Sequence, residues 1–349
     1  MLQRLIGEVR RVKRIGEVID IEVKIKDRLI KTKLPRGLKG KRGMISRRFM
    51  GYLPKQKDSI ILTEAETRKF LKEEIQKREI IENRFLNIEI WEELGARIGS
   101  LLYKPEKRAL FIPRIELGKS GWIYWGGILD ILSLNEPKSL WNKRYRRTSK
   151  GYEYKKGRLR VLKKITLLKD LPAILVDYTI TSGIKKKIDF GQYLMIPAPG
   201  LGQENILYLP LHDRIEEFRY WRYISPWPWY SEYAGFKLDG FLWVNESKGI
   251  CLGGFTKPER LELIRLDRDK KGVNLTFMFK REELKPGRPK RYTILYIIGD
   301  SFHIDGESIT VSSNKRIIVR SLRRPSQRGL SERMIKGIGQ IWIGYETLP

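Results

Sequence analysis

The chain has 349 residues, of which 41% are apolar and 11% aromatic, enough to form a sizeable hydrophobic core. Its 71 Lys and Arg outnumber its 41 Asp and Glu, and the net charge of +30 indicates a polyanionic partner. With a single cysteine, Cys251, and only two histidines, His212 and His303, the composition excludes an intramolecular disulfide and argues against a zinc cluster. We therefore expect no metal and no cofactor.

No apolar stretch approaches the roughly 20 residues that span a bilayer, and the first residues lack the apolar core and cleavage site of a signal peptide. These features predict a cytoplasmic protein without a membrane span. The abundance of Lys, Arg, Glu and Ile is typical of thermophile proteins, which carry networks of ion pairs. Such networks need both signs of charge, so they do not explain the excess of cations.

Residues 1–62 are expected to form a small basic β module, with 18 Lys and Arg against 6 Asp and Glu. Ile19, Ile21, Val23 and Ile25 alternate with charged residues, which predicts a half-buried strand. A turn at Lys26–Asp27 leads into a second strand over 29–34, so the pattern predicts a hairpin. A glycine-rich basic loop follows from Pro35.

Residues 63–83 are predicted to form a connecting helix. Thr63 followed by Glu66 matches a capping box, and Phe70, Leu71 and Ile75 recur at helical spacing. From residue 84 to residue 349 the sequence alternates short apolar strands with Gly, Pro, Asn and Asp turns. This pattern indicates a mainly β domain of the sandwich or barrel type, with a basic C-terminal extension.

Within this large domain the order of short motifs resembles the galactose mutarotase-like superfamily, which includes the aldose 1-epimerases. The resemblance covers about residues 84–312. The matching stretches are Asn87 to Leu101, Gly126 to Asp130, the strand pair from Leu162 to Thr181, and Leu284 to Gly287 before a late strand. It implies a large antiparallel β-supersandwich that recognises a carbohydrate.

The resemblance also implies a mechanism in which a histidine acid and a glutamate base open and reclose a sugar ring. In this chain Gln192, within Gly191 to Leu194, falls where that histidine is expected. Glutamine can hydrogen-bond a sugar but cannot donate a proton, so the chain is expected to lack the usual epimerase acid.

The segment 218–230 is unusually rich in aromatic residues and is interrupted by prolines. Aromatic rings stack on sugar faces or on bases, and interleaved arginines add cationic contacts. The alternative is a loop held by its own aromatic packing. The residues expected to bind carbohydrate are Trp122, Trp125, Gln192, Arg219, Trp221, Arg222, Trp227 and Trp229.

His212 next to Asp213 is the candidate acid–base pair, since a histidine beside a carboxylate can exchange protons near neutral pH. The alternative is a structural histidine. If the chain is an enzyme, the family resemblance implies an isomerase of the aldose 1-epimerase type.

Basic clusters recur along the chain, and cations on loops near glycines suit a phosphate backbone. Each cluster alone could equally be a solvated face. Two clusters lie at 143–147 and 185–187. The residues expected to contact a polyanion are Lys39, Lys41, Arg42, Arg47, Arg48, Arg320, Arg323, Arg324 and Arg328.

Three functional hypotheses follow. The first is a carbohydrate-recognising protein without the usual epimerase acid, whose basic module contacts a polyanion. The second is a non-enzymatic nucleic-acid or ribonucleoprotein component on a reused supersandwich. The third is an aldose epimerase with an atypical acid–base pair.

Overall fold

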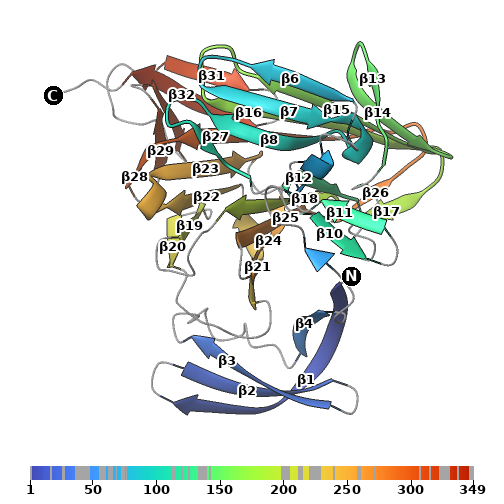
Figure 1. The fold of residues 1–349 in the computed structure, drawn as a ribbon, viewed down its shortest axis with the longest axis vertical. Helices are drawn as coiled ribbons and strands as arrows, with labels where there is room; N and C mark the ends of the chain where they lie inside the picture. Colours follow the sequence, from blue (N-terminus) through green and yellow to red (C-terminus); the bar gives the residue numbers. More distant parts are fainter. Residues whose placement is uncertain are drawn as a thin grey trace.

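The computed structural model of the chain is built mostly of antiparallel β-strands, which confirms the mainly β fold class (Figure 1). The structure describes residues 2–15, 18–25, 28–35, 48–54, 60–61, 66–67, 69–71, 75, 77–111, 115–118, 121–124, 126–132, 140, 143–197, 205–210, 215–219, 229–238, 240–257, 261–269, 272–305, 308–313, 316–321, 331–335 and 338–345. In some of these strands only the backbone is described.

The first four strands form one antiparallel sheet of order β3-β2-β1-β4, at the lower end of the view in Figure 1. Its strands are β1 (Leu2–Ile15), β2 (Val18–Ile25), β3 (Arg28–Pro35) and β4 (Arg48–Pro54). Strands β2 and β3 pair with Ile25 opposite Arg28, which confirms the predicted hairpin. The residues of its predicted turn, 26–27, lie outside the described part of the chain.

Two nine-stranded sheets make up the main body. The first sheet has the order β21-β24-β25-β18-β12-β8-β7-β6, with β9 paired to β8. Its strands are β6 (Arg78–Glu82), β7 (Leu86–Trp91), β8 (Arg97–Tyr103), β9 (Arg108–Ala109), β12 (Gly127–Ile131), β18 (Gly191–Pro197), β21 (Trp229–Leu238), β24 (Leu261–Asp269) and β25 (Gly272–Phe279). A short 3-10 helix, η1 (Glu92–Leu94), joins β7 to β8.

The second sheet has the order β13-β14-β15-β16-β27-β23-β22-β19-β20. Its strands are β13 (Arg146–Thr148), β14 (Gly151–Lys156), β15 (Leu159–Leu167), β16 (Ala173–Ser182), β19 (Asn205–Pro210), β20 (Ile215–Arg219), β22 (Gly240–Asn245), β23 (Ile250–Phe255) and β27 (Lys290–Gly299). The turn between β22 and β23 contains the 3-10 helix η2 (Glu246–Lys248).

The last five strands form a separate sheet of order β28-β29-β30-β32-β31. Its strands are β28 (Ser301–Asp305), β29 (Ser308–Ser313), β30 (Arg316–Ser321), β31 (Ser331–Ile335) and β32 (Gly339–Tyr345). Two small sheets complete the fold. One joins β5 (Ile60–Ile61), β10 (Ile115–Gly118) and β11 (Gly121–Tyr124), and the other joins β17 (Lys186–Ile188) to β26 (Glu282–Leu284).

The central strands of the second nine-stranded sheet are buried on both faces. In β27, Ile294, Tyr296 and Ile298 point into a first core shared with the first sheet. Leu295 and Ile297, which alternate with them, point into a second core shared with the five-stranded sheet. Because side chains of a strand alternate between faces, burial on both sides produces the continuous apolar run at 294–298. The described part of the C-terminal region is therefore a third packed layer, where the sequence suggested a basic extension.

The predicted connecting helix over 63–83 is wrong in its second half. Helical turns occur at 66–67 and 69–71, but Arg78–Glu82 form strand β6, which pairs with β7. The side chain of Asn83 explains the turn between these strands, because its Oδ1 accepts hydrogen bonds from the backbone N–H groups of Phe85 and Leu86 at 2.8 Å each. Strand β5 lies within the first 62 residues, yet it pairs with β10 of the large domain.

Candidate functional site

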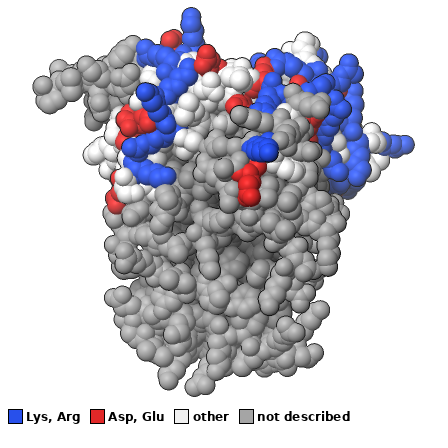
Figure 2. Space-filling model, in the orientation of Figure 1, with Lys and Arg blue, Asp and Glu red and all other residues white. Residues whose placement is uncertain are grey.

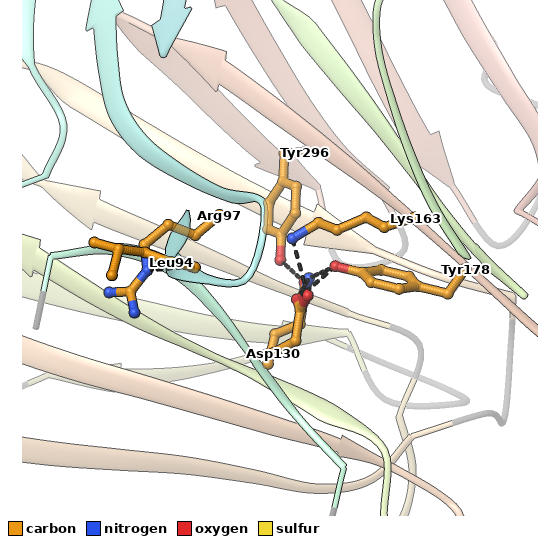
Figure 3. A network of polar contacts seen from close by, with 7 residues as sticks. Leu94, Arg97, Asp130, Lys163, Tyr178 and Tyr296 are labelled. Atoms are coloured by element: carbon orange, nitrogen blue, oxygen red, sulfur yellow. Dashed lines mark hydrogen bonds and ion pairs between the residues drawn. The ribbon is translucent and has the colours of Figure 1, made fainter. Parts of the chain in front are cut away.

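A buried polar network lies inside the first core, where the two nine-stranded sheets face each other (Figure 3). Asp130 on β12 and Gln192 on β18 are direct neighbours across the first sheet. Lys163, Tyr178 and Tyr296 reach them from β15, β16 and β27 of the second sheet. The network therefore joins the two sheets by polar contacts through an otherwise apolar layer.

Asp130 accepts three hydrogen bonds. The Lys163 ammonium donates to its Oδ2 at 3.0 Å, and the Tyr178 hydroxyl donates to its Oδ1 at 2.6 Å. The Gln192 amide nitrogen donates to the same Oδ1 at 3.1 Å. The Gln192 amide also bonds the Tyr178 hydroxyl through its nitrogen and accepts from the Tyr296 hydroxyl through its oxygen.

Burial dominates the electrostatics of this network. It lowers the pKa of Lys163, because burial disfavours the charged ammonium, and the adjacent Asp130 carboxylate opposes that shift. Burial also raises the pKa of Tyr178 and of Tyr296 well above the ordinary value, so both phenols remain protonated donors. The Asp130 carboxylate receives three hydrogen bonds, one of them from the Lys163 ammonium. The two residues therefore form a buried, hydrogen-bonded ion pair.

Gln192 is fully buried and both ends of its amide are bonded within the core. The expectation that its side chain contacts a sugar is therefore not met in this structure, because no accessible surface is left on it. Gln192 lies on β18, and its side chain points between the sheets. We assign Gln192 a structural role in the polar network.

The other residues expected to bind carbohydrate fall mostly outside the described part of the chain. Those outside are Trp125, Trp221, Arg222 and Trp227. Trp122 lies on β11, Arg219 ends β20 and Trp229 begins β21, with only their backbone described. Strands β20 and β21 are edge strands of different nine-stranded sheets, so the aromatic segment connects the two sheets at their edges. The candidate acid–base pair, His212 and Asp213, also lies outside the described residues.

Most of the predicted polyanion-binding residues lie outside the described part as well. These are Lys39, Lys41, Arg42, Arg47, Arg323, Arg324 and Arg328. Arg48 begins β4 and Arg320 lies in β30. The described residues do not bring Arg48 and Arg320 into one sheet.

The structure assembles a different cationic surface from segments that are far apart in the sequence. Strands β14, β15, β16 and β27 are antiparallel neighbours, so the β14–β15 hairpin, the residues after β16 and the start of β27 lie at one end of the second sheet. The β17–β26 pair brings 186–188 and 282–284 to the same end. We call this surface the cationic end: Lys155, Lys156, Arg158, Arg160, Lys185, Lys186, Lys187, Lys285, Arg288, Lys290 and Arg291.

These segments carry eleven Lys and Arg against three Glu, namely Glu153, Glu282 and Glu283. Figure 2 shows Lys and Arg crowded at the right of the view, where Figure 1 places the tips of β14 and β15. Glu153 is bound by Lys155 at 3.1 Å and by Arg160, Glu283 by Lys185 at 3.3 Å, and Glu282 by Lys290 at 2.7 Å. All three carboxylates are therefore already neutralised.

Seven cations of this surface have no carboxylate within 4.0 Å among the described residues, and all seven are exposed: Lys156, Arg158, Lys186, Lys187, Lys285, Arg288 and Arg291. Gly157 and Gly287 lie in two of the turns with φ of +56° and +71°, and the space where a Cβ would stand is open at both. A ligand backbone can therefore approach these turns closely. The sequence showed the 185–187 cluster alone, because its proximity to 155–160 and 285–291 arises from strand pairing.

Among the described residues no group of three or more His, Cys, Asp or Glu side chains is placed to hold a metal ion. Nor does that part of the chain include a helix of the length and apolarity needed to cross a membrane.

No protein-family model and no curated protein matches the chain. Among solved structures, a galactose mutarotase related enzyme from Lactobacillus acidophilus is 10% identical, with a TM-score of 0.46, over 64% of this chain and 97% of that one. A galactose mutarotase-like protein from Lactobacillus casei is 10% identical, with a TM-score of 0.44, over 64% of this chain and 100% of that one. A TPR-domain containing protein from Parabacteroides distasonis is 12% identical, with a TM-score of 0.44, over 97% of this chain and 59% of that one.

The first two of these structures bear the family name that the sequence motifs suggested. Their likeness to this chain transfers no site and no reaction to it.

Proposed function

We propose that this protein is a non-enzymatic binding protein on a mutarotase-like scaffold, and that its cationic end contacts the phosphate backbone of a nucleic acid. The observation that supports this proposal is the convergence of three cation-rich turns, with seven exposed cations that no carboxylate of the described residues neutralises. A surface of one sign of charge raises the local concentration of a ligand of the opposite sign.

The chemistry of the surface suits a phosphodiester chain. Lys provides a mobile point charge, and Arg provides a planar fork of donors that matches two phosphate oxygens. Open turns at Gly157 and Gly287 let the backbone of the ligand come near. Such contacts position a nucleic acid without reading its sequence. We therefore expect an affinity that depends strongly on charge and little on the sequence of the nucleic acid.

The test is a binding panel measured by fluorescence anisotropy with the full chain at low salt. The ligands are a labelled RNA, a DNA duplex, heparin as an acidic polysaccharide and a neutral glycan. We expect both nucleic acids to bind with similar affinity whatever their sequence, and the neutral glycan not to compete. Binding of heparin alone would reassign the surface to an acidic polysaccharide, and no binding of any polyanion would overturn the proposal.

Carbohydrate recognition is the second candidate function. It is supported by the aromatic segment that connects the edge strands β20 and β21, and by the mutarotase names of the two Lactobacillus structures. It is separable from the first, because a neutral sugar would bind irrespective of salt. A glycan array that shows no ligand would count against it.

Epimerase activity is expected to be absent, and replacing Gln192 with His is expected not to create it. The introduced imidazole would be enclosed by Asp130, Tyr178 and Tyr296 in the core, where no sugar reaches it. The measurement is the rate of anomer interconversion of glucose and galactose by polarimetry, with His212→Ala as a second variant. Acceleration by the wild type that His212→Ala abolishes would revive the atypical acid–base pair instead.

A further inference from the structure

A cavity of about 310 Å³ opens where the two nine-stranded sheets meet, at the end of the sandwich opposite the cationic end. Strand pairing shows this position. Ile250 of the cavity wall precedes Cys251, which lies opposite Gly299, the last residue of β27. The cationic end lies at the first residues of β27. The first sheet contributes Arg108 and Leu110 to the cavity wall. The second contributes Trp243, Ser247, Lys248 and Ile250.

Two buried hydrogen-bond donors of the cavity wall have no partner within the described part of the chain. One is Nε1 of Trp243, whose side chain is only 2% exposed, and the other is Nη1 of Arg108. A buried donor without an acceptor costs about 1–3 kcal/mol, so most native structures satisfy such groups. Because both of these donors lie on one cavity without an acceptor in the described structure, we infer that their acceptors belong to a ligand.

The described residues of the cavity wall carry positive charge and include no carboxylate. Burial, and then the nearby Arg108 guanidinium, lower the pKa of Lys248, as expected for two cations that approach each other in a partly desolvated space. Glu106 contacts Arg108 through Nη2 at 3.6 Å, an exposed pair that leaves Nη1 unengaged. Leu110, Ile250 and the indole of Trp243 supply the apolar part of the wall.

We propose that this cavity binds a small organic anion through a carboxylate or phosphate group. The indole N–H, the guanidinium and the ammonium are donors with no acceptor capacity, so the complementary group must bring lone pairs and negative charge. Arginine favours a planar, bidentate carboxylate or phosphate. The volume suits a body of about monosaccharide size, and the apolar wall contacts its non-polar face.

The test compares D-glucuronate and inorganic phosphate with D-glucose by titration calorimetry on the full chain. Glucuronate differs from glucose by the carboxylate that the proposal requires, so we expect at least one of the two anions to bind and glucose not to bind. The indole N–H resonance of Trp243 is expected to shift on binding. Equal or absent binding of all three compounds, down to dissociation constants of about 10 mM, would overturn the proposal.

Two variants locate the site. Arg108→Gln, on a half-exposed side chain, is expected to weaken anion binding by about tenfold or more, and Trp243→Phe, which keeps an aromatic side chain but removes the indole N–H, by a similar factor. The matched control is Trp342→Phe, because Trp342 also has an unpartnered Nε1 but does not line the cavity. Unchanged binding in Arg108→Gln, or equal weakening in Trp342→Phe, would refute the assignment.

Discussion

Replacing Asp130 with alanine is expected to lower the free energy of unfolding by about 3–5 kcal/mol, because it leaves the buried Lys163 ammonium without its counterion. The Lys163 side chain is 1% exposed, and among the described residues its one ion pair is with Asp130 at 3.0 Å. The substitution also removes the acceptor of the Tyr178 hydroxyl and one acceptor of the Gln192 amide. Urea denaturation followed by tryptophan fluorescence measures the loss.

A control distinguishes the two possible causes of this loss of stability, which are an uncompensated buried charge and poorer packing. In the double variant Asp130→Asn with Lys163→Met, both charges disappear while the volumes stay similar, so most of the stability is expected to return. The single Asp130→Asn variant is expected to be less stable than the double variant. A loss below about 1 kcal/mol in Asp130→Ala would contradict the described burial of the pair.

Neutralising three cations of the cationic end is expected to cause the largest loss of nucleic-acid affinity. The variant combines Lys186→Gln, Lys187→Gln and Arg288→Gln, which are exposed residues without an ion pair in the described structure. Each lost phosphate contact costs roughly tenfold near 0.1 M salt, so the loss of all three should weaken binding by about 1,000-fold. Fluorescence anisotropy with a DNA duplex at fixed salt gives the comparison.

The matched control changes the net charge by the same amount elsewhere. It combines Lys107→Gln, Lys150→Gln and Lys169→Gln, three exposed lysines in turns outside the cationic end. If overall charge alone attracted the polymer, both triple variants would lose affinity equally. Such an outcome would remove the cationic end as a site while leaving the general attraction in place.

The sequence predicted parts of the fold whose signal is local. The alternation from Ile19 to Ile25 and the turn at 26–27 predicted the β2–β3 hairpin correctly, because period two and turn chemistry act between neighbours in the chain. The predicted helix over 63–83 was extended too far. The turn between β6 and β7 depends on hydrogen bonds from the side chain of Asn83, and one asparagine is a weak turn signal in a sequence. The third layer, the sheet of β28 to β32, was not predicted. Its presence makes β27 buried on both faces, and such a strand has the same continuous apolar run as other buried segments.

The two charged sites depend on contacts between distant segments. Lys163 offered one usable local signal, a lysine at an inward position between Val161 and Ile165 of β15, both of which lie in the first core. Its partner Asp130 is 33 residues away and could not be identified from spacing. The first and last clusters of the cationic end, 155–160 and 285–291, are more than 100 residues apart in the sequence, so each cluster alone looked like a solvated face.

The salt dependence of nucleic-acid affinity tests the central claim most directly. The observed association constant of the wild type for a DNA duplex would be measured from about 50 to 300 mM salt, and its logarithm plotted against the logarithm of salt concentration. Contact of about five phosphates by the cationic end predicts a slope near −4.5, reduced in magnitude by up to about three in the variant of Lys186, Lys187 and Arg288. A flat plot, or the same slope in wild type and variant, would contradict the assignment of polyanion binding to this surface.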